Sequence, residues 1–430
     1  MLNTSQDSLL VCGDVLADSR RVVRDACVEI SGGVILGVKR REGGGLDFRG
    51  ENSIVLPGLI DMHVHLRGLE LSYKEDEASG TLAALRGCLT GVVDMPNTKP
   101  PLSTPEALEA KLRALSENSY VDYSVYAGVP SRPELVRKLA EKPIVGFKIY
   151  PEDFEKESSL CEVLREAERR GLLVVLHAEH PLLIRAPDYG YDRRLYRSCV
   201  AEELAVLEIA ELTERCRAKP RIHVTHVSCY RTLELAKSLG FTVDVTPHHL
   251  LFSQEEAPYL FSPYCESKVN PPLRDAHEKS KLWIGVFSGL VDALASDHAP
   301  HAFSEKTSLD PSLCSPGFSS IEAWPGVMAR VFYGIGAIEL FARLASENPA
   351  KILGLGGCFG FEKGCVASLS VFRESITRDP MAYTKARVSP YSSLERLECL
   401  AVIVRGRLAM LKGRLEASRG SGFNLALSRP

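Results

Sequence analysis

Several features that would place a chain in a particular class of protein are missing from these 430 residues. No apolar run reaches the ~18 residues that a membrane-spanning helix needs, and the N-terminus has no basic stretch followed by a long apolar core, as a secretory signal would have. The net charge is only −3 and no basic run occurs, so there is no electrostatic case for nucleic acid or an anionic membrane as a partner. We expect a cytoplasmic protein that acts on a small molecule.

Several catalytic and redox motifs are missing as well. There is no Gly-x-x-x-x-Gly-Lys phosphate loop, no Gly-x-Ser-x-Gly nucleophile elbow and no His-Glu-x-x-His helix. The 12 cysteines include no Cys-x-x-Cys pair, which argues against a zinc ribbon or a thioredoxin-type site, and we expect most of them to be buried apolar residues. Only two glutamines occur, Gln6 and Gln254, and this poverty in thermolabile amides is compatible with a thermophilic source, in which intracellular disulfides are also found.

What is present is the composition of a large globular protein, with 45% hydrophobic and 25% charged residues. Over residues 57–357, apolar strand-like runs alternate with amphipathic helical stretches, which predicts repeated βα units and a (β/α)₈ barrel. The eight predicted strands lie within residues 60–66, 91–98, 121–129, 145–150, 172–179, 221–228, 241–249 and 291–301.

The two ends of the chain have a different pattern. Residues 1–56 contain short strand-like runs separated by glycine turns, and residues 358–430 repeat this pattern at 365–375 and 399–415. Because domain termini often lie close together, we expect both ends to form one small β-sandwich beside the barrel.

Potentially reactive side chains follow the predicted barrel strands. His63 and His65 are two residues apart, so on a strand both imidazoles point to the same face and can bind one metal ion. A polar strand end is the alternative for this pair alone, but the other strand ends carry similar residues, and active sites of such barrels lie at that end. The residues concerned are His63, His65, Asn97, Lys148, His177, His226, His248, His249, Asp297, His298 and His301.

This arrangement resembles the binuclear metal centre of the amidohydrolase superfamily. The resemblance implies that one metal is held by His63, His65 and Asp297, and the other by His177 and His226. It further implies that a carboxylated Lys148 bridges the two ions.

Elementary electrostatics supports the modified lysine. Two divalent cations a few Å apart repel each other, and neutral imidazoles with one aspartate supply little negative charge between them. A buried lysine loses its proton readily, and a neutral amine can add carbon dioxide to form a carbamate with two bridging oxygens. The alternative for Lys148 is a lysine that extends to solvent. Imidazole and carboxylate ligands suit Zn²⁺ best, although manganese or cobalt can substitute.

Four motifs narrow the resemblance further: HVHLRG at His63–Gly68, DMPNT at Asp94–Thr98, KVNPPLR at Lys268–Arg274 and SDHAPH at Ser296–His301. Together they resemble the long-chain dihydroorotases, and the resemblance implies an enzyme that interconverts dihydroorotate and N-carbamoyl-L-aspartate in pyrimidine biosynthesis. Two segments depart from that pattern, Pro316–Gly326 and the CVASLSV run at 365–371, and both lie outside the expected ligand set.

The resemblance also implies roles around the substrate. Asp297 takes a proton from the metal-activated water and passes it to the departing ring nitrogen. Arg67, on the same strand face as His65, is suited to a bidentate contact with the substrate carboxylate. Asn97 and His301 would complete that carboxylate site, and Asn270 and Arg274 would contact the ring amides.

A segment directly after the bridging lysine, Pro151–Ser159, is predicted to be a mobile lid. Its charged composition would keep a closed state only marginally favoured, and Phe154 would cover the bound ring.

Two alternatives stay open at this point. A hydantoinase or allantoinase would share the metals and differ in the carboxylate contacts. A non-catalytic scaffold for aspartate transcarbamoylase is expected to lose ligands, and here every ligand is present. The resemblance also leaves open a homodimer, an association with aspartate transcarbamoylase, and an additional ion near Cys229 and His248 or His249.

Overall fold

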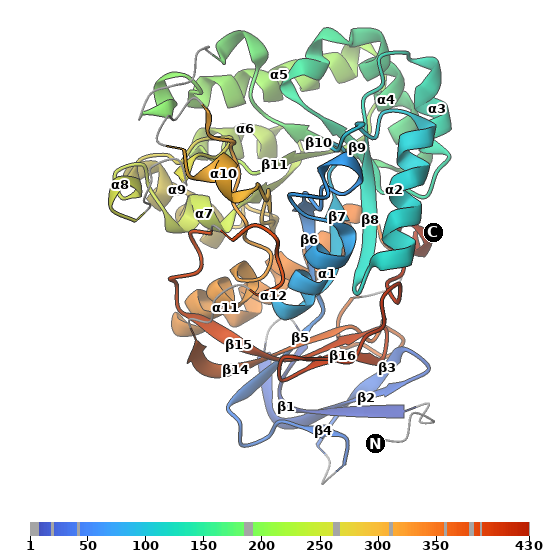
Figure 1. Cartoon of the computed structure of the whole chain (residues 1–430), viewed down its shortest axis with the longest axis vertical. Coiled ribbons are helices and arrows are strands. Elements are labelled where there is room, and N and C mark those ends of the chain that lie inside the picture. Colours follow the sequence, from blue (N-terminus) through green and yellow to red (C-terminus); the bar gives the residue numbers. More distant parts are fainter. Residues whose placement is uncertain are drawn as a thin grey trace.

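The computed structural model describes residues 8–18, 21–40, 44–184, 192–260, 267–308, 313–356, 359–377, 382–387 and 389–429. Within them the chain forms a barrel above a separate sheet that is built from both ends of the sequence (Figure 1).

The barrel contains eight parallel strands in sequence order, and all eight predicted strands are confirmed. Val64 forms a parallel bridge with His298, and the backbone N–H of His65 donates to the carbonyl of His298 at 2.7 Å, so the first strand meets the chain that leaves the last one. This contact nearly closes the barrel. The strands are β6 (Leu59–Val64), β7 (Leu89–Asp94), β8 (Asp122–Gly128), β9 (Gly146–Ile149), β10 (Leu173–His177), β11 (Arg221–Thr225), β12 (Thr242–Val245) and β13 (Ala293–Leu294).

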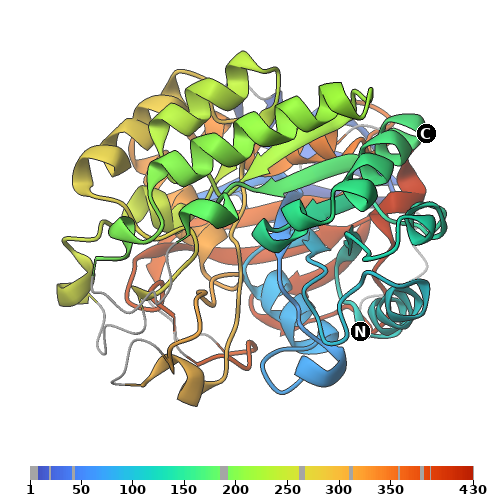
Figure 2. The ribbon, with the colours of Figure 1, turned by 90° about the horizontal axis from the view of Figure 1, so that it is seen from above.

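Helices connect these strands and cover the outside of the barrel, as the view from above shows (Figure 2). Their ends follow local sequence signals: the Thr104 hydroxyl accepts from the N–H of Ala107 at the start of α2, and Gly171, at φ 62°, ends α4. The helices of eight residues or more are α1 (Glu77–Arg86), α2 (Pro105–Asn118), α4 (Glu157–Arg170), α5 (Cys199–Arg215), α6 (Tyr230–Ser238), α9 (Ala276–Phe287) and α11 (Trp324–Gly334). Shorter ones are α3 (Glu134–Ala140), α7 (Pro247–Leu251), α8 (Ala257–Leu260), α10 (Phe303–Lys306), α12 (Ile338–Ala342) and α13 (Asn348–Leu353).

Both ends of the chain contribute to one nine-stranded sheet, which confirms the predicted small β-domain. The antiparallel pairing of β5 with β14 joins the N-terminal strands to the C-terminal ones. In Figure 1 the C-terminal strands lie between the barrel and the N-terminal strands. The strands are β1 (Ser8–Asp18), β2 (Arg21–Ser31), β3 (Val34–Lys39), β4 (Leu46–Asp47), β5 (Ser53–Pro57), β14 (Leu369–Thr377), β15 (Arg396–Val404), β16 (Arg407–Leu411) and β17 (Arg414–Leu415).

The chain passes from this sheet into the barrel at Gly58, between β5 and β6. A Cβ atom there would lie 2.5 Å from Thr90 Oγ1 and 2.8 Å from Ser368 Cβ. Glycine is therefore required by close packing, and the sharp junction fixes where β6 enters the barrel.

The last residues of the chain leave the sheet, contrary to the expectation that residues 358–430 belong to it throughout. A short 3₁₀ helix at Leu425–Ser428 packs against β8, and Leu425 is buried in an apolar cluster with Ile60 and Tyr126 of the barrel. Burial of this leucine links the C-terminus to the barrel interior.

Most of the described cysteines are buried, as predicted, but they are also paired in disulfides, because tertiary packing brings distant cysteines together. Cys314 and Cys365 are disulfide-bonded, and the structure describes both members of four further pairs. These are Cys12–Cys27, Cys88–Cys399, Cys161–Cys216 and Cys199–Cys229.

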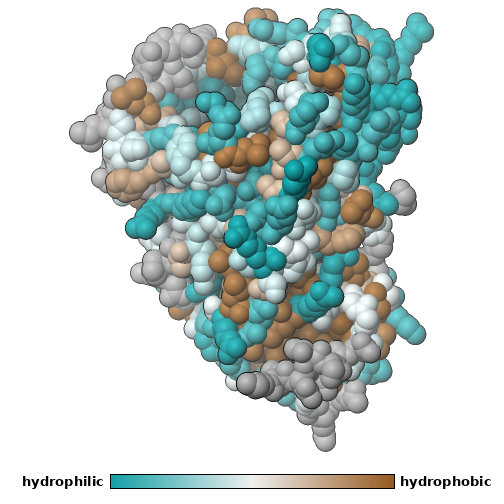
Figure 3. Space-filling model, turned by 45° about the vertical axis from the view of Figure 1, so that its right-hand side comes forward, coloured by the Kyte–Doolittle hydropathy of each residue, from teal (hydrophilic) through white to brown (hydrophobic). Residues whose placement is uncertain are grey.

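The surface is mostly polar over the barrel, and apolar residues gather toward the terminal sheet on the face that Figure 3 shows. Among the helices of the described residues, none is long and apolar enough to cross a membrane.

Candidate metal centre and substrate cavity

Two histidines and an aspartate converge at the C-terminal end of the barrel. Nε2 of His63 lies 3.1 Å and Nε2 of His65 lies 3.0 Å from the same oxygen of Asp297, and all three side chains are buried. Their potential ligand atoms lie within 4.8 Å of one another. Burial lowers the pKa of His63 to about 4, so its ring is neutral and able to bind a metal at physiological pH.

Hydrogen bonds on the outer side of each imidazole fix its orientation. Nδ1 of His63 lies 2.5 Å from the hydroxyl of Thr225, which donates to Asp244 at 2.9 Å. Nδ1 of His65 lies 2.6 Å from the amide oxygen of Asn97, so this nitrogen carries the proton. Nε2 of His65 is therefore left as the ligand atom. Such outer partners hold metal-binding histidines in place and strengthen them as ligands.

His177, His226 and Lys148 lie beside this group. The rings of His177 and His226 are 4.4 Å apart between centroids, and the ring of His226 is 5.1 Å from that of His63. In the described part of the chain, Nζ of Lys148 is buried and has no hydrogen-bond partner, and the same holds for Nδ1 of His226. Burial lowers the pKa of Lys148 to about 7. A buried amine that is half neutral at pH 7, among imidazoles, fits the requirement for a carbamate between two cations.

Glu179 and Arg197 support His177, and the sequence analysis did not identify either of them. Glu179 accepts a hydrogen bond from Nε2 of His177 at 2.7 Å, and Arg197 forms a bidentate pair with the same carboxylate at 2.9 and 2.7 Å. Burial opposes the charge on Glu179, but Arg197 and His177 outweigh it and lower its pKa well below the usual range. The His-x-Glu spacing on a strand end was the available sequence signal, because both side chains point the same way.

Strained backbone conformations occur at the strand ends that carry these residues. Arg67, His226 and Asp297 have φ values of 57°, 44° and 46°, in the left-handed region that residues other than glycine seldom adopt. Each costs on the order of 1–3 kcal/mol and is kept because the surrounding structure enforces it. The turns aim these side chains into the centre of the barrel mouth.

A cavity of about 320 Å³ opens above these candidate metal ligands. It has the size expected for a small-molecule site. It also brings in Tyr150, Glu152 and Ile184, which the sequence analysis did not single out. The cavity is lined by His63, His65, Arg67, Asn97, Tyr150, Pro151, Glu152, His177, Ile184, Arg197, His226, Asn270, Asp297, Ala299 and Pro316.

Four of the five predicted substrate-binding residues lie in or next to the cavity. Arg67, Asn97 and Asn270 line the cavity, and His301 lies directly behind, with Nε2 at 3.3 Å from the Arg67 guanidinium. Burial lowers the pKa of His301 to about 2, so its ring is neutral and adds no charge to the site.

Arg274 does not line the cavity. Its guanidinium is buried against the Glu202 carboxylate at 3.0 Å and the Ser228 hydroxyl at 2.8 Å. The structure therefore corrects its assignment as a substrate contact, because these groups hold it within the wall of the barrel mouth.

The segment predicted as a lid forms a short 3₁₀ helix at Pro151–Glu155, followed by the first residues of α4. Asp153 accepts a hydrogen bond from the N–H of Tyr150 at 2.8 Å and pairs with Lys156 at 2.7 Å. The ring of Phe154 packs against His180, 5.5 Å between centroids, and does not line the cavity. The predicted cover over the substrate ring is therefore not formed by Phe154 in this conformation.

An additional ion at Cys229 is not supported. Cys229 is bonded to Cys199, and a disulfide sulfur is not the thiolate that metals prefer. His249 is engaged with Thr246 at 2.8 Å, and the ring of His248 lies edge-on to Phe318.

Known proteins are similar to this chain in sequence and in fold. Residues 54–409 match the sequence profile of the amidohydrolase family. The dihydroorotase of Aeropyrum pernix is 47% identical over 407 residues, which cover 93% of this chain and 94% of that protein. The dihydroorotase of Saccharolobus solfataricus is 37% identical over 373 residues (86% and 87%), and an allantoinase of Rubrobacter xylanophilus is 31% identical over 445 residues (95% and 97%).

Among solved structures, an L-hydantoinase from Arthrobacter aurescens superimposes with a TM-score of 0.86 at 24% identity, covering 97% of this chain and 99% of that one. At 24% identity this likeness shows the fold alone, whereas the dihydroorotases named above are similar to nearly the whole chain at higher sequence identity. The protein therefore belongs to the amidohydrolase family and, within it, to the dihydroorotases.

Proposed function

We propose that this protein is a dihydroorotase that interconverts dihydroorotate and N-carbamoyl-L-aspartate, and that Arg67 recognises the carboxylate of both. The observation that carries the proposal is the guanidinium of Arg67. It is only 7% exposed, lines the cavity and, among the described residues, has no carboxylate within ion-pair distance. Its hydrogen bond goes to the carbonyl of Pro300 at 3.2 Å, and the neutral His301 lies beside it.

A buried guanidinium without an acidic partner calls for an anion from outside the chain. The substrate carboxylate supplies that anion, and Asn97, at the same side of the cavity, offers an amide N–H₂ to it. Neutral substrates such as hydantoin would leave Arg67 unpaired, so the geometry favours dihydroorotate over the substrates of the related hydantoinases and allantoinases.

The residues present fit a pair of divalent cations, which we take to be zinc. His63, His65 and Asp297 would hold one ion, His177 and His226 the other, and Lys148 as a carbamate would lie between them. The donor set of imidazoles and carboxylates suits zinc, and the unpartnered Nζ of Lys148 is the atom that the modification would use. Once bound, the ions would acidify a water molecule and polarise the ring carbonyl.

Asp297 is the proton carrier in this proposal. Burial alone would raise the pKa of Asp297, but His63 and His65 outweigh it and lower the pKa well below its usual range. The carboxylate is therefore ionised at neutral pH and can accept a proton from the attacking water. It can then deliver that proton to the ring nitrogen as the amide bond breaks, and the reverse sequence closes the ring.

A comparison of substrates tests this function. The purified protein is assayed with dihydroorotate, dihydrouracil, hydantoin and allantoin, and its metal content is measured in the same preparation. We expect turnover of dihydroorotate in both directions and two metal ions per chain. Equal activity on hydantoin or allantoin would place the protein elsewhere in the family, and a protein without activity on any of them would favour the scaffold alternative. A homodimer and an aspartate transcarbamoylase partner remain predictions from the family resemblance.

A further inference from the structure

A disulfide bond lies directly behind the half of the metal centre that contains His177 and His226. Cys199 is the first residue of α5, and Cys229 caps the start of α6. These helices follow β10 and β11, the strands that lead to His177 and His226. The bond therefore links the start of α5, which follows the strand of His177, to the start of α6, which follows the strand of His226.

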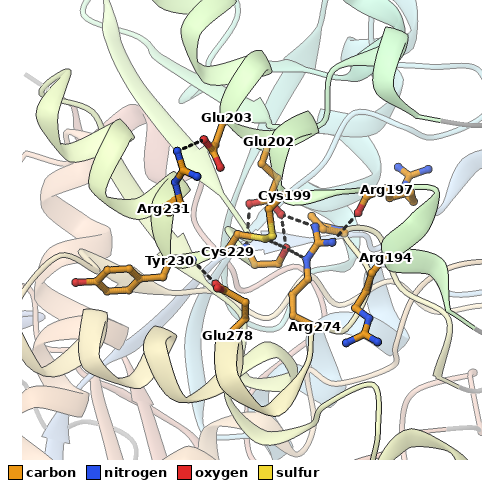
Figure 4. The surroundings of a disulfide bond; sticks show 12 residues. Arg194, Arg197, Cys199, Glu202, Glu203, Cys229, Tyr230, Arg231, Arg274 and Glu278 are labelled. Atoms are coloured by element: carbon orange, nitrogen blue, oxygen red, sulfur yellow. Dashed lines mark hydrogen bonds and ion pairs between the residues drawn. A yellow bond between two sulfur atoms is a disulfide. The ribbon is translucent and has the colours of Figure 1, made fainter.

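A buried polar cluster fills the space beside the disulfide (Figure 4). Arg274 donates to Glu202 at 3.0 Å and to the Ser228 hydroxyl at 2.8 Å, and that hydroxyl is also hydrogen-bonded to Glu202. Glu202 lies in the first turn of α5, whereas Ser228 is two residues from His226 and next to Cys229. The cluster and the disulfide thus join the same two connections side by side.

The same cluster extends to His177. Arg274 donates from Nη1 to the carbonyl of Arg197 at 2.6 Å. Arg197 in turn holds Glu179 through the bidentate pair, and Glu179 fixes His177. His177 is therefore tied to the cluster through Glu179 and Arg197, and Arg197 lies only two residues before Cys199. His226 is tied to the cluster through the chain, two residues from Ser228.

We propose that the Cys199–Cys229 disulfide is a positioning element for the His177–His226 half of the metal centre. With the bond intact, the starts of α5 and α6 stay at a fixed distance from each other, and both imidazoles stay in place for a divalent cation. With the bond open, α5 and α6 can separate, and the affinity of this half falls while His63, His65 and Asp297 keep theirs. The inference rests on the metal centre in the proposed function.

A second disulfide, Cys161–Cys216, lies at the C-terminal end of α5 and provides a matched control. The Cys161–Cys216 disulfide joins α4 to the residue that ends α5 and closes a separation of 55 residues, against 30 for Cys199–Cys229. Its effect on the unfolded chain is therefore at least as large. It has no place in the hydrogen-bonded path to His177 or His226 described above.

The experiment compares C199A/C229A and C161A/C216A with the oxidised wild-type protein. Zinc affinity is measured by competition with a chromophoric chelator, and thermal unfolding is followed in the same samples. We expect C199A/C229A to bind one of its two zinc ions at least ~10-fold more weakly, the range seen when outer partners of metal ligands are lost. Its activity should return when excess zinc is added, which a general loss of folding would not allow. C161A/C216A should keep both ions at wild-type affinity.

A second measurement keeps the test decisive if C199A/C229A does not fold. Zinc affinity is then measured without reductant on the single variants C199A and C161A, each of which lacks one of the two disulfides, and C199A should bind one zinc ion more weakly than C161A does. Wild-type zinc affinity in C199A/C229A or in C199A, or equal weakening in the matching variant of the Cys161–Cys216 pair, would overturn the inference. If the oxidised wild type binds two zinc ions and turns over dihydroorotate, such a result leaves the proposed function standing. If the wild type does neither, the proposed function itself fails.

Discussion

The amide oxygen of Asn97 lies 2.6 Å from Nδ1 of His65. Asn97 is therefore expected to have two roles, and contact with the substrate carboxylate is only one of them. Its oxygen orients a predicted metal ligand, and its N–H₂ group remains for the substrate.

Two substitutions at Asn97 separate these tasks. Asn97→Ala removes the acceptor for His65 and should weaken metal binding by ~10–100-fold. Asn97→Asp keeps the acceptor, so metal affinity should stay close to the wild type, but its negative charge opposes the substrate carboxylate and should raise KM by at least ~10-fold. Chelator competition and steady-state kinetics on both variants check this. Equal metal affinity in the two variants would show that the contact with His65 has no role.

Substrate choice is expected to depend on Arg67. Loss of a buried charge partner costs roughly 2–5 kcal/mol, so dihydroorotate should exceed dihydrouracil in kcat/KM by at least ~30-fold in the wild type. Arg67→Met should collapse this ratio by impairing the reaction of dihydroorotate, while metal content stays unchanged. Arg132→Met, an exposed arginine whose pair with Glu134 spans 3.7 Å, serves as the control and should keep the wild-type ratio. A wild-type ratio in Arg67→Met would contradict the carboxylate contact.

Carboxylation of Lys148 should depend on pH. Only the neutral amine adds carbon dioxide, and burial lowers the pKa of Lys148 from 10.5 to about 7. The neutral fraction rises as pH increases through 7, so at one fixed concentration of dissolved carbon dioxide the metal-free protein should gain the carbamate about 10-fold faster at pH 8 than at pH 6. Incorporation of ¹³C-bicarbonate followed by NMR measures the rate. Lys148→Ala should incorporate no label, lose metal and recover part of its activity with a small carboxylic acid. An unmodified, fully active wild-type protein would rule out the carbamate.

Stability of the Arg67 loop depends on a fully buried lysine. Lys111 pairs with Asp94 and Glu77 at 2.7 Å each and donates to the carbonyl of Arg67 at 3.0 Å. Lys111→Met leaves two buried carboxylates without their cation and should lower the free energy of unfolding by ~3–5 kcal/mol. Lys142→Met, which breaks a partly exposed pair with Glu109, should leave the free energy of unfolding close to that of the wild type, because solvent screens this pair. Guanidinium unfolding of both variants provides the comparison, and similar small losses would argue against a charged cluster.

Local sequence patterns are sufficient to predict the strands of the barrel and the positions of the candidate site residues. All eight strands were predicted, because buried parallel strands are apolar throughout and their ends are marked by polar residues. His63, His65 and Asp297 converge as expected, since every βα unit places the end of its strand at the same face. These outcomes depend on local pattern and on a repeated topology.

The contacts among side chains at that face depend on how elements far apart in the chain pack together. Arg274 was assigned to the substrate, yet it pairs with Glu202 in the barrel wall, and Phe154 packs on His180 instead of covering the cavity. The His-x-Glu spacing makes Glu179 a candidate partner of His177, but the Arg197 that pairs with this buried carboxylate lies 18 residues later in the chain. The cysteines likewise pair across separations of up to 311 residues. Such contacts depend on distances between elements that are far apart in the chain, and no local propensity or spacing encodes those distances.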